Sequence, residues 1–386
     1  MHSPLELRKF VAPEFVFGNG ARFLANRYAK NLAAKKILIV ADKGIIKTGM
    51  VDELCNLLDD SNLEYDIYSD ISSNPRDHEI MDGAQLFSDS QCNFIIALGG
   101  GSSMDCAKGI GIVSSNKKHI LDFEGVDKVH IPSPPLICIP TTAGSSADVS
   151  QFAIIMDTEQ KIKVAIISKA LVPDVALIDP STSLTMDQYL TATTALDALV
   201  HSFEAFVSNA SSPITDLNAL DSINLISHNI KPLLNDLQNI DLRSKIMLSS
   251  LEAGLAFSNA SLGLVHAMSH SLGGFLDLSH GECNAILLDP VIDFNFISET
   301  DKYLKIGKIM GINFKDSKIK NQKELIINHL KELKKACGVT STLKKLGVKE
   351  KDIPQLAENA MNDPCIVTNP RRPTIENIEE IFINAL

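Results

Sequence analysis

The sequence predicts a two-part fold, with an α/β first half built on a mostly parallel sheet and an all-helical second half. Short apolar runs rich in Ile and Val alternate with amphipathic stretches up to about residue 180. Strands that alternate with helices indicate a parallel sheet covered on both faces. Beyond residue 185 the strand-like runs stop and long helical windows follow. Pro, Ser and Thr cluster in DPSTSLT at 179–185, where we expect the boundary.

The elements expected in the first half follow in order along the chain. Short apolar runs bounded by turn residues are typical of buried parallel strands. We expect such strands at 35–42, 63–70, 92–99 and 134–142, with two more inside 163–180. Amphipathic spacing predicts helices at about 45–59 and 77–91, and a third that begins at the glycines of 99–101.

The second half shows helical periodicity throughout. The clearest windows are 186–208, 216–237, 241–261 and 323–338, and the NPRRPT segment at 369–374 predicts a turn before a last helix. The chain is 45% hydrophobic and 22% charged, which favours a large buried core.

Composition excludes several classes of partner. The net charge is −11 and the isoelectric point is near 5.4, which argues against nucleic acid or an anionic membrane surface. No apolar run approaches the roughly 20 residues that span a bilayer. The seven cysteines are scattered and form no CxxC pair, which favours free thiols in a reducing cytoplasm. We therefore expect a cytoplasmic protein that acts on a small molecule.

A glycine turn follows the third predicted strand. Gly99, Gly100 and Gly101 allow close approach of a ligand, and the helix that follows presents free N–H groups and a positive dipole end. This arrangement suits a pyrophosphate, although position 104 is Met, so the motif is not GxGxxG. The alternative is a tight strand-to-helix turn.

Asp42 ends the first predicted strand. A carboxylate at this place would bind the ribose of an adenosine and would favour NAD over NADP. The alternative is that Asp42 only caps the following helix.

Histidines and a carboxylate cluster in two apolar windows of the second half. Asp197 and His201 stand four apart, as do His266 and His270, so each pair shares one helical face. His280 follows in a loop-like SHGE segment. A carboxylate with apolar neighbours needs a partner or a metal. Three imidazoles and one carboxylate suit Fe²⁺ or Zn²⁺, but spacing alone leaves open which of the three later histidines is not a ligand.

The chain resembles the iron-containing (group III) alcohol dehydrogenases nearly end to end. The motifs that carry the resemblance are FGNGA at 17–21, SSNP at 72–75, GGGSSMDCAK at 99–108, PTTAGSSADVS at 140–150, ALDALVH at 195–201, GLVHAMSHSLGG at 263–274, HGECNA at 280–285 and NPRRPT at 369–374. The resemblance implies a dehydroquinate synthase-like fold, with a NAD-binding domain over 1–184 and a helical metal domain over 185–386. It also implies a homodimer or a larger homo-oligomer.

The resemblance also implies roles for individual residues. The metal ligands are Asp197, His201, His266 and His280, and His270 is a catalytic histidine that does not bind the metal. Phe257 lines the substrate pocket. The implied cofactor contacts are Asp42, Asn74, Gly100, Gly101, Ser102, Asp105, Thr141, Thr142, Ser145, Lys163, Thr182 and Leu184.

The implied activity is the reversible, NAD-linked oxidation of a primary alcohol to an aldehyde by hydride transfer, with Fe²⁺ or, alternatively, Zn²⁺ or Mn²⁺. Ser103 stands where the family has Pro, and Ser146, Ala147 and Asp148 replace Gly, Ser and Glu. Two alternatives are kept. One is a zinc-dependent polyol dehydrogenase or a lyase on the same fold. Those relatives typically use one Asp and two His as metal ligands, so a fourth ligand, His201, argues against this alternative. The other is a dehydrogenase-like regulatory protein with little turnover, which turnover of simple alcohols would exclude.

Overall fold

The computed structural model describes residues 8–315 and 317–386, and these form two compact units. One is Val11–Met186, and the other is Asp187–Leu386 together with residues 8–10. The predicted fold class is confirmed, because the first unit is α/β with a parallel sheet and the second is helical. Among the described residues, no helix is both long and apolar enough to cross a membrane.

The main sheet of the first unit has six strands, and all of them are parallel. Its order is β1-β9-β6-β4-β2-β3. The strands are β1 (Glu14–Phe17), β2 (Lys36–Val40), β3 (Glu64–Tyr68), β4 (Phe94–Gly99), β6 (Leu136–Pro140) and β9 (Val175–Ile178). β4 and β6 are buried along their whole length, as expected for central strands covered on both faces.

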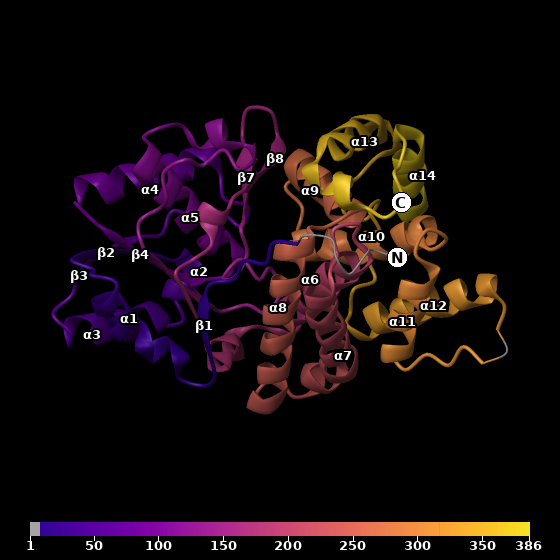
Figure 1. Ribbon diagram of the computed structural model, residues 1–386, viewed down its shortest axis with the longest axis horizontal. Helices are drawn as coiled ribbons and strands as arrows, with labels where there is room; N and C mark the ends of the chain where they lie inside the picture. The colour runs from indigo at the N-terminus through magenta and orange to yellow at the C-terminus, as the bar shows by residue number, and fades with distance from the viewer. Residues whose placement is uncertain (1–7, 316) are drawn as a thin grey trace. The chain divides into compact units, whose positions relative to one another are not determined.

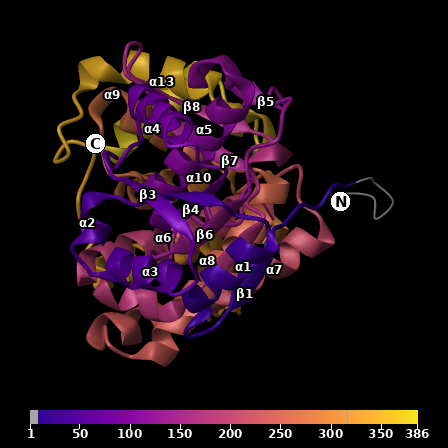
Figure 2. The same ribbon diagram turned by 90° about the vertical axis from the view of Figure 1, so that its left-hand side faces the viewer.

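Alternate side chains of the central strands enter two separate cores. Leu38 of β2 and Ile95 of β4 pack into a core under α4 (Asp77–Asp89) and α5 (Gly101–Asn116). Their neighbours Ile37 and Ile96 pack into the opposite core, under α1 (Ala25–Asn31) and α3 (Met50–Asp59). Figures 1 and 2 show the strands between these two helical layers. The period of two along each strand thus buries both faces.

Two sequence predictions for this unit need correction. The helix expected over 45–59 is two helices, α2 (Lys43–Ile46) and α3, because the chain turns at Gly49 with φ +82°. The strand expected near residue 163 is β8 (Ile162–Ile167), which lies outside the main sheet. It pairs antiparallel with β7 (Phe152–Asp157) and parallel with the short β5 (Gly125–Val126).

The second unit consists of helices among its described residues. They are α6 (Gln188–Val207), α7 (Pro213–Asn235), α8 (Ile240–Ala260), α9 (Leu264–Leu276), α10 (His280–Asn295), α11 (Thr300–Ile309), α12 (Ile319–Ala336), α13 (Ile353–Asn362) and α14 (Ile375–Ala385). Short 3-10 turns lie in both units: η1 (Ala21–Leu24), η2 (Ile120–Phe123), η3 (Lys169–Leu171) and η4 (Pro180–Thr185) in the first, and η5 (Glu350–Asp352) and η6 (Pro364–Thr368) in the second. α6 packs against α7, α8 and α10 and is buried almost all round from residue 191 onward. A helix apolar on every face belongs in the core of a bundle.

Candidate metal centre and nucleotide-binding edge

Four metal-ligand side chains meet inside the helical unit. One donor atom from each lies within 4.8 Å of the others, and the residues are Asp197, His201, His266 and His280. The first three are buried, and the side chain of His280 is 27% exposed. They come from α6, α9 and α10, so three helices supply one cluster.

Local sequence explains the first three positions. Asp197 and His201 are four residues apart on α6 and therefore share a face of that helix. His266 lies in the first turn of α9, and its ring stacks on His201 with centroids 4.6 Å apart. The spacing arguments thus correctly brought an aspartate and a histidine of one helix to a histidine of another.

His280 lies on a helix and not in the loop that its sequence suggested. It is the first residue of α10, and its Nδ1 is 3.1 Å from the Ser269 hydroxyl oxygen. Its Nε2 is 3.8 Å from Asp197 Oδ1. Gly281 permits this placement, because a Cβ there would lie only 2.7 Å from the Thr193 carbonyl oxygen of α6. Glycine at this position lets the start of α10 reach the ligand-bearing helix.

The amide of Asn284 shows that the cluster holds a surplus of lone pairs. Its Nδ2 lies 2.7 Å from Asp197 Oδ1 and 3.1 Å from Nε2 of both His266 and His280. An amide nitrogen has two hydrogens, so it cannot satisfy three acceptors. Asn284 is fully buried, and its own Oδ1 has no hydrogen-bond partner among the described residues. A cation bound by the four donors would use those lone pairs, so the residues fit a divalent metal.

The protonation of His266 also suits a metal. Burial lowers the pKa of His266 to about 3, although the nearby Asp197 carboxylate opposes the shift. The imidazole is therefore neutral at physiological pH and keeps a lone pair for coordination. Burial also raises the pKa of Glu204, the hydrogen-bond partner of His266, to about 7, against the opposing effect of backbone N–H groups.

His270 lies beside the four-residue cluster but belongs to a different group. Its ring stacks on His280 with centroids 5.3 Å apart, and its Nδ1 is 2.8 Å from Asp363 Oδ2. The same carboxylate accepts the backbone N–H of Cys365 at 2.8 Å through Oδ1. His270, Asp363 and Cys365 also have donor atoms within 4.8 Å of one another. Burial raises the pKa of the Cys365 thiol far above its usual value, so this group forms a hydrogen-bonded network and lacks the thiolate that a metal prefers.

Phe257 of α8 lies at the edge of the metal-ligand cluster. Its ring stacks on the His201 ring with centroids 4.4 Å apart and planes inclined by 24°. Phe257 is buried and places an apolar surface beside the metal ligands. Its expected part in the substrate pocket stays a prediction.

The nucleotide candidates of the first unit gather where the strand order reverses. The chain passes from β2 outward to β3 and then returns to β4 on the other side of β2. In open α/β sheets, ligands bind at such a point, beyond the carboxyl ends of the strands. Asp42 follows β2 and the glycine turn follows β4, so both lie at this edge.

The glycine turn is packed too closely for side chains. A Cβ at Gly99 would lie 2.5 Å from Ser103 Oγ, and one at Gly101 would lie 2.8 Å from Ser145 Oγ. A Cβ at Gly100 would lie 3.2 Å from the Thr142 methyl carbon. The N-cap residue of α5 is Gly100, which has no side chain to cap the first N–H groups of the helix at this edge. A cradle with a helix N-terminus fits the pyrophosphate of a dinucleotide.

Asp42 is a helix cap and also faces the glycine turn. Its Oδ1 accepts the N–H groups of Gly44 and Ile45 at 2.7 and 3.2 Å, so the cap interpretation is correct in part. Its Oδ2 lies 3.3 Å from Ser103 Oγ. Ser103, which stands where the family has Pro, therefore connects the first turn of α5 to this carboxylate. The cap uses Oδ1 alone, and ribose binding by Asp42 stays a prediction.

The other cofactor candidates fall into two sets. Thr141, Thr142 and Ser145 follow β6, and Thr182 and Leu184 follow β9 in η4, all beyond carboxyl ends of the sheet. The second set, Asn74, Asp105 and Lys163, adjoins β7. Asp105 Oδ2 accepts the backbone N–H of Ile154, and the carbonyl of Pro75, the residue after Asn74, accepts that of Met156. Lys163 of β8 lies opposite Met156 in the antiparallel pair of strands. Apart from these two sets, Gly100 belongs to the glycine turn, and Ser102 follows it in the first turn of α5. The structure alone leaves each of these contacts a prediction.

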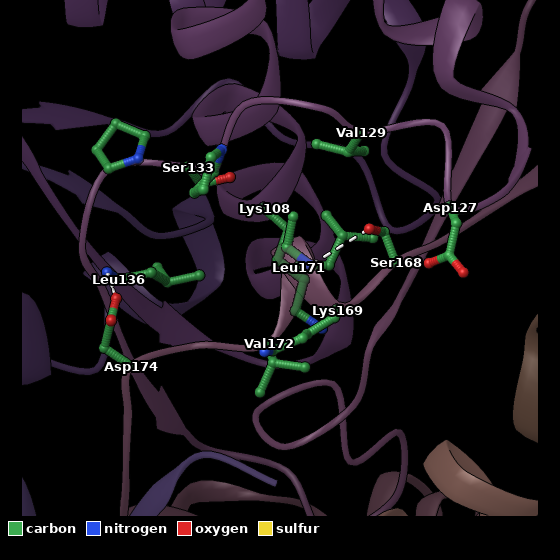
Figure 3. A pocket seen from close by; sticks show the side chains of 13 residues that line it. Lys108, Asp127, Val129, Ser133, Leu136, Ser168, Lys169, Leu171, Val172 and Asp174 are labelled. Atoms are coloured by element: carbon green, nitrogen blue, oxygen red, sulfur yellow. Dashed lines mark hydrogen bonds between the residues drawn. The ribbon is translucent and has the colours of Figure 1, made fainter. Parts of the chain in front are cut away.

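A separate hollow of about 440 Å³ lies in the first unit near residues that precede β6 and β9 (Figure 3). Lys108 lines it, and the Lys108 Nζ already donates to Ser150 O, Ser150 Oγ and Phe152 O at 2.8 to 3.3 Å. An ammonium group has three hydrogens, so none remains for a ligand. None of the predicted cofactor residues lines this hollow.

The loop after β6 contains a strained residue. Ser146 has φ +51° and is 2% exposed, and it stands where the family has Gly. A left-handed backbone costs a residue with a side chain about 1 kcal/mol relative to Gly. Ser146→Gly removes this cost but also the 3.2 Å hydrogen bond from Ser146 Oγ to Gly144 O, so the free energy of unfolding of this unit should rise by less than about 1 kcal/mol, measured by urea denaturation. Ser90→Gly is the control, because Ser90 has φ −76° and its substitution should not raise the free energy of unfolding. An equal change in the free energy of unfolding of the two variants would refute backbone strain at Ser146.

Asp148 in the same loop should make stability depend on pH. Burial raises the pKa of Asp148 from 3.8 to about 6, although Lys108 opposes this shift. The folded state then binds more protons than the unfolded state between these values, so stability decreases as pH rises from about 4 to 6. At neutral pH the cost is about 3 kcal/mol. Asp148→Asn should recover this amount at pH 7 and little at pH 4, measured as urea midpoints.

The exposed Asp122→Asn is the control for that experiment and should leave the midpoint unchanged at both pH values. A variant Asp148→Asn that is less stable than the parent at pH 7 would contradict the predicted sign.

Three residues around the cluster were missed by sequence reasoning. Glu204 follows Asp197 by seven positions on α6, Asn284 follows His280 by four on α10, and Asp363 is 93 positions from His270. Helical spacing contains a signal for Glu204 and for Asn284. Asp363 carries no local signal, because tertiary folding alone brings it to His270.

Comparisons with known proteins show the family of the chain. A model of the iron-containing alcohol dehydrogenases matches residues 12–180, and a model of the C-terminal part of the Fe-containing alcohol dehydrogenase family matches 191–386. The chain is 36% identical to a 1,3-propanediol dehydrogenase of Citrobacter freundii over 96% of each chain. It is 35% identical to an NAD-dependent methanol dehydrogenase of Bacillus methanolicus over 98% of this chain and 99% of the other.

A solved structure of a 1,3-propanediol oxidoreductase superimposes with a TM-score of 0.95 at 35% identity, covering 99% of this chain and all of that one. The fold and the cluster define a metal-dependent alcohol dehydrogenase. The chain belongs to the iron-containing alcohol dehydrogenase family.

Proposed function

We propose that the protein catalyses the reversible oxidation of a primary alcohol to an aldehyde, with a divalent metal ion and NAD. The observation that carries this proposal is the buried cluster of three imidazoles and one carboxylate in a chain of this family. We assign nucleotide binding to Val11–Met186 and metal binding to the helical unit.

Asp197, His201, His266 and His280 would hold the metal. When bound, a divalent cation supplies Lewis-acid stabilisation of negative charge on the substrate oxygen, and NAD accepts the hydride. Fe²⁺ is the expected ion, since the family is iron-containing, and imidazole with carboxylate also suits Zn²⁺ and Mn²⁺.

The residues at the carboxyl edge of the sheet would bind NAD. The cradle at Gly99–Gly101 and the start of α5 suit the pyrophosphate, and Asp42 suits the ribose hydroxyls. A carboxylate at this place repels the 2′-phosphate of NADP, which supports a preference for NAD. The curated methanol dehydrogenase relative is NAD-dependent by name.

His270 would remove the hydroxyl proton of the alcohol, while two electrons and one proton leave the carbinol carbon as hydride. Its Nδ1 is held by Asp363, so its Nε2 is available to accept a proton. Phe257 would shield the metal ligands from water on one side. The substrate is a primary monoalcohol or a diol, and the propanediol relatives support including diols.

Anaerobic purification followed by Fe²⁺ loading tests the proposal. NADH formation is followed at 340 nm with a panel of primary alcohols, 1,2-diols and 1,3-propanediol, and then with NADP in place of NAD. Metal-dependent NADH formation is the expected result. Binding of both metal and NAD without turnover would overturn it and favour the regulatory alternative.

We also propose a homo-oligomer located in the cytoplasm. β1 is an edge strand, and Phe15 on it and Phe23 after it are 42% and 47% exposed, which supports pairing between copies. The seven cysteines are free and buried, which supports a reducing compartment.

A further inference from the structure

Glu204 is a buried carboxylate on the same face of α6 as two predicted metal ligands. It follows Asp197 by seven positions and His201 by three, and it is 5% exposed. It is not among the residues whose donor atoms converge in the metal-ligand cluster. Burying a carboxylate is costly without strong partners, so its partners indicate what it does.

The Glu204 carboxylate caps helix α9 from outside that helix. It accepts the N–H of Gly263 at 2.9 Å and that of Val265 at 2.6 Å, and it lies 3.4 Å from the backbone nitrogen of His266. Gly263 is the N-cap residue and supplies no side-chain cap of its own. A Cβ there would lie 2.9 Å from Glu204 Oε1, so glycine makes room for the carboxylate. The first N–H groups of a helix and its dipole favour an anion at this place.

The same carboxylate also contacts the ring of His266. Glu204 Oε2 is 2.7 Å from His266 Nδ1. Both oxygens of Glu204 already accept backbone N–H groups, Oε2 from Gly263 and Oε1 from Val265, so the carboxylate acts as an acceptor at this place. Nδ1 of His266 then carries the hydrogen and Nε2 keeps the lone pair. That Nε2 faces the cluster, 3.1 Å from the Asn284 amide nitrogen. A carboxylate behind a coordinating imidazole fixes both its tautomer and its orientation.

We propose that Glu204 is a positioning residue that sets the tautomer of His266 and the start of α9, and thereby strengthens metal binding without being a ligand. This inference rests on the proposed function, because it needs His266 to bind a metal. One side chain thus connects the ligand-bearing face of α6 to the ligand-bearing turn of α9.

Glu204→Gln tests the inference with Zn²⁺ as the probe. The glutamine amide presents N–H groups toward backbone and imidazole donors, which disfavours the Nδ1–H tautomer. Competition between apoprotein and a chromophoric zinc chelator should show Zn²⁺ affinity reduced by about 10- to 100-fold. Glu204→Asp, which keeps the charge, should recover part of the affinity. Glu252→Gln is the matched control, since Glu252 lies on α8 and is not among the residues of the metal-ligand cluster.

A second measurement covers the case in which Glu204→Gln does not fold. In the parent apoprotein labelled with ¹⁵N-histidine, the His266 ring should show a protonated Nδ1 and an unprotonated Nε2. The opposite tautomer, or unchanged Zn²⁺ affinity in a folded Glu204→Gln protein, would overturn the inference and leave the proposed function intact. Failure of the parent protein to bind Zn²⁺, Fe²⁺ or Mn²⁺ would instead overturn the proposed function, and this inference with it.

Discussion

His266→Ala should lose the bound metal and reduce turnover by at least about a thousandfold. The imidazole Nε2 faces the centre of the cluster, and removing it leaves three donors for a cation. Metal stabilisation of developing charge is worth several kcal/mol, and each 1.4 kcal/mol is tenfold in rate. Elemental analysis of the purified protein and kcat with the best alcohol of the panel give the result.

His228→Ala is the matched control for that substitution. His228 is an exposed histidine on α7 whose Nδ1 lies 2.8 Å from its own helix at Asn224 O. The control should keep metal and activity. A His266→Ala protein with one metal ion per chain would remove His266 from the ligand set.

His270→Ala should reduce turnover by about 10²- to 10⁴-fold while metal content stays at the parental level. His270 lies next to the cluster, but its Nδ1 is committed to Asp363, and its group is separate from the four ligands. Loss of a positioned base slows proton removal without removing a donor from the metal. Metal content and kcat should be measured on the same preparation, loaded anaerobically with Fe²⁺. Metal loss in this variant would make His270 a ligand.

Much of the candidate site follows from helical spacing. The pair Asp197 and His201 is local, so one turn of α6 suffices to predict that the two side chains converge. Spacing could not choose between His266 and His270, because both lie on α9. Their partners separate them: His266 Nε2 meets Asp197 and Asn284 in the cluster, and His270 Nδ1 meets Asp363.

The incorrect predictions have physical causes of two kinds. Gly49 ends one helix and starts another through a left-handed turn, which periodicity does not detect. The hairpin of β7 and β8 is local, but β7 was not predicted from the sequence, which left β8 without its partner. The helical position of His280 depends on the close approach of α10 to Thr193 of α6, which is remote in sequence. The local sequence pattern predicts that a strand or helix forms, whereas tertiary contacts decide which other elements it pairs with or packs against.

All the groups proposed to bind or orient the metal lie on α6, α9 and α10, and the glycine cradle lies entirely within Val11–Met186. Each set is assembled within a single folded body. Affinity for one cofactor is then set by residues that need not change when affinity for the other is altered. Under the proposed assignment, a lineage would exchange its nucleotide preference through Asp42 while inheriting its metal chemistry unchanged, and selection would adjust the two properties at different rates.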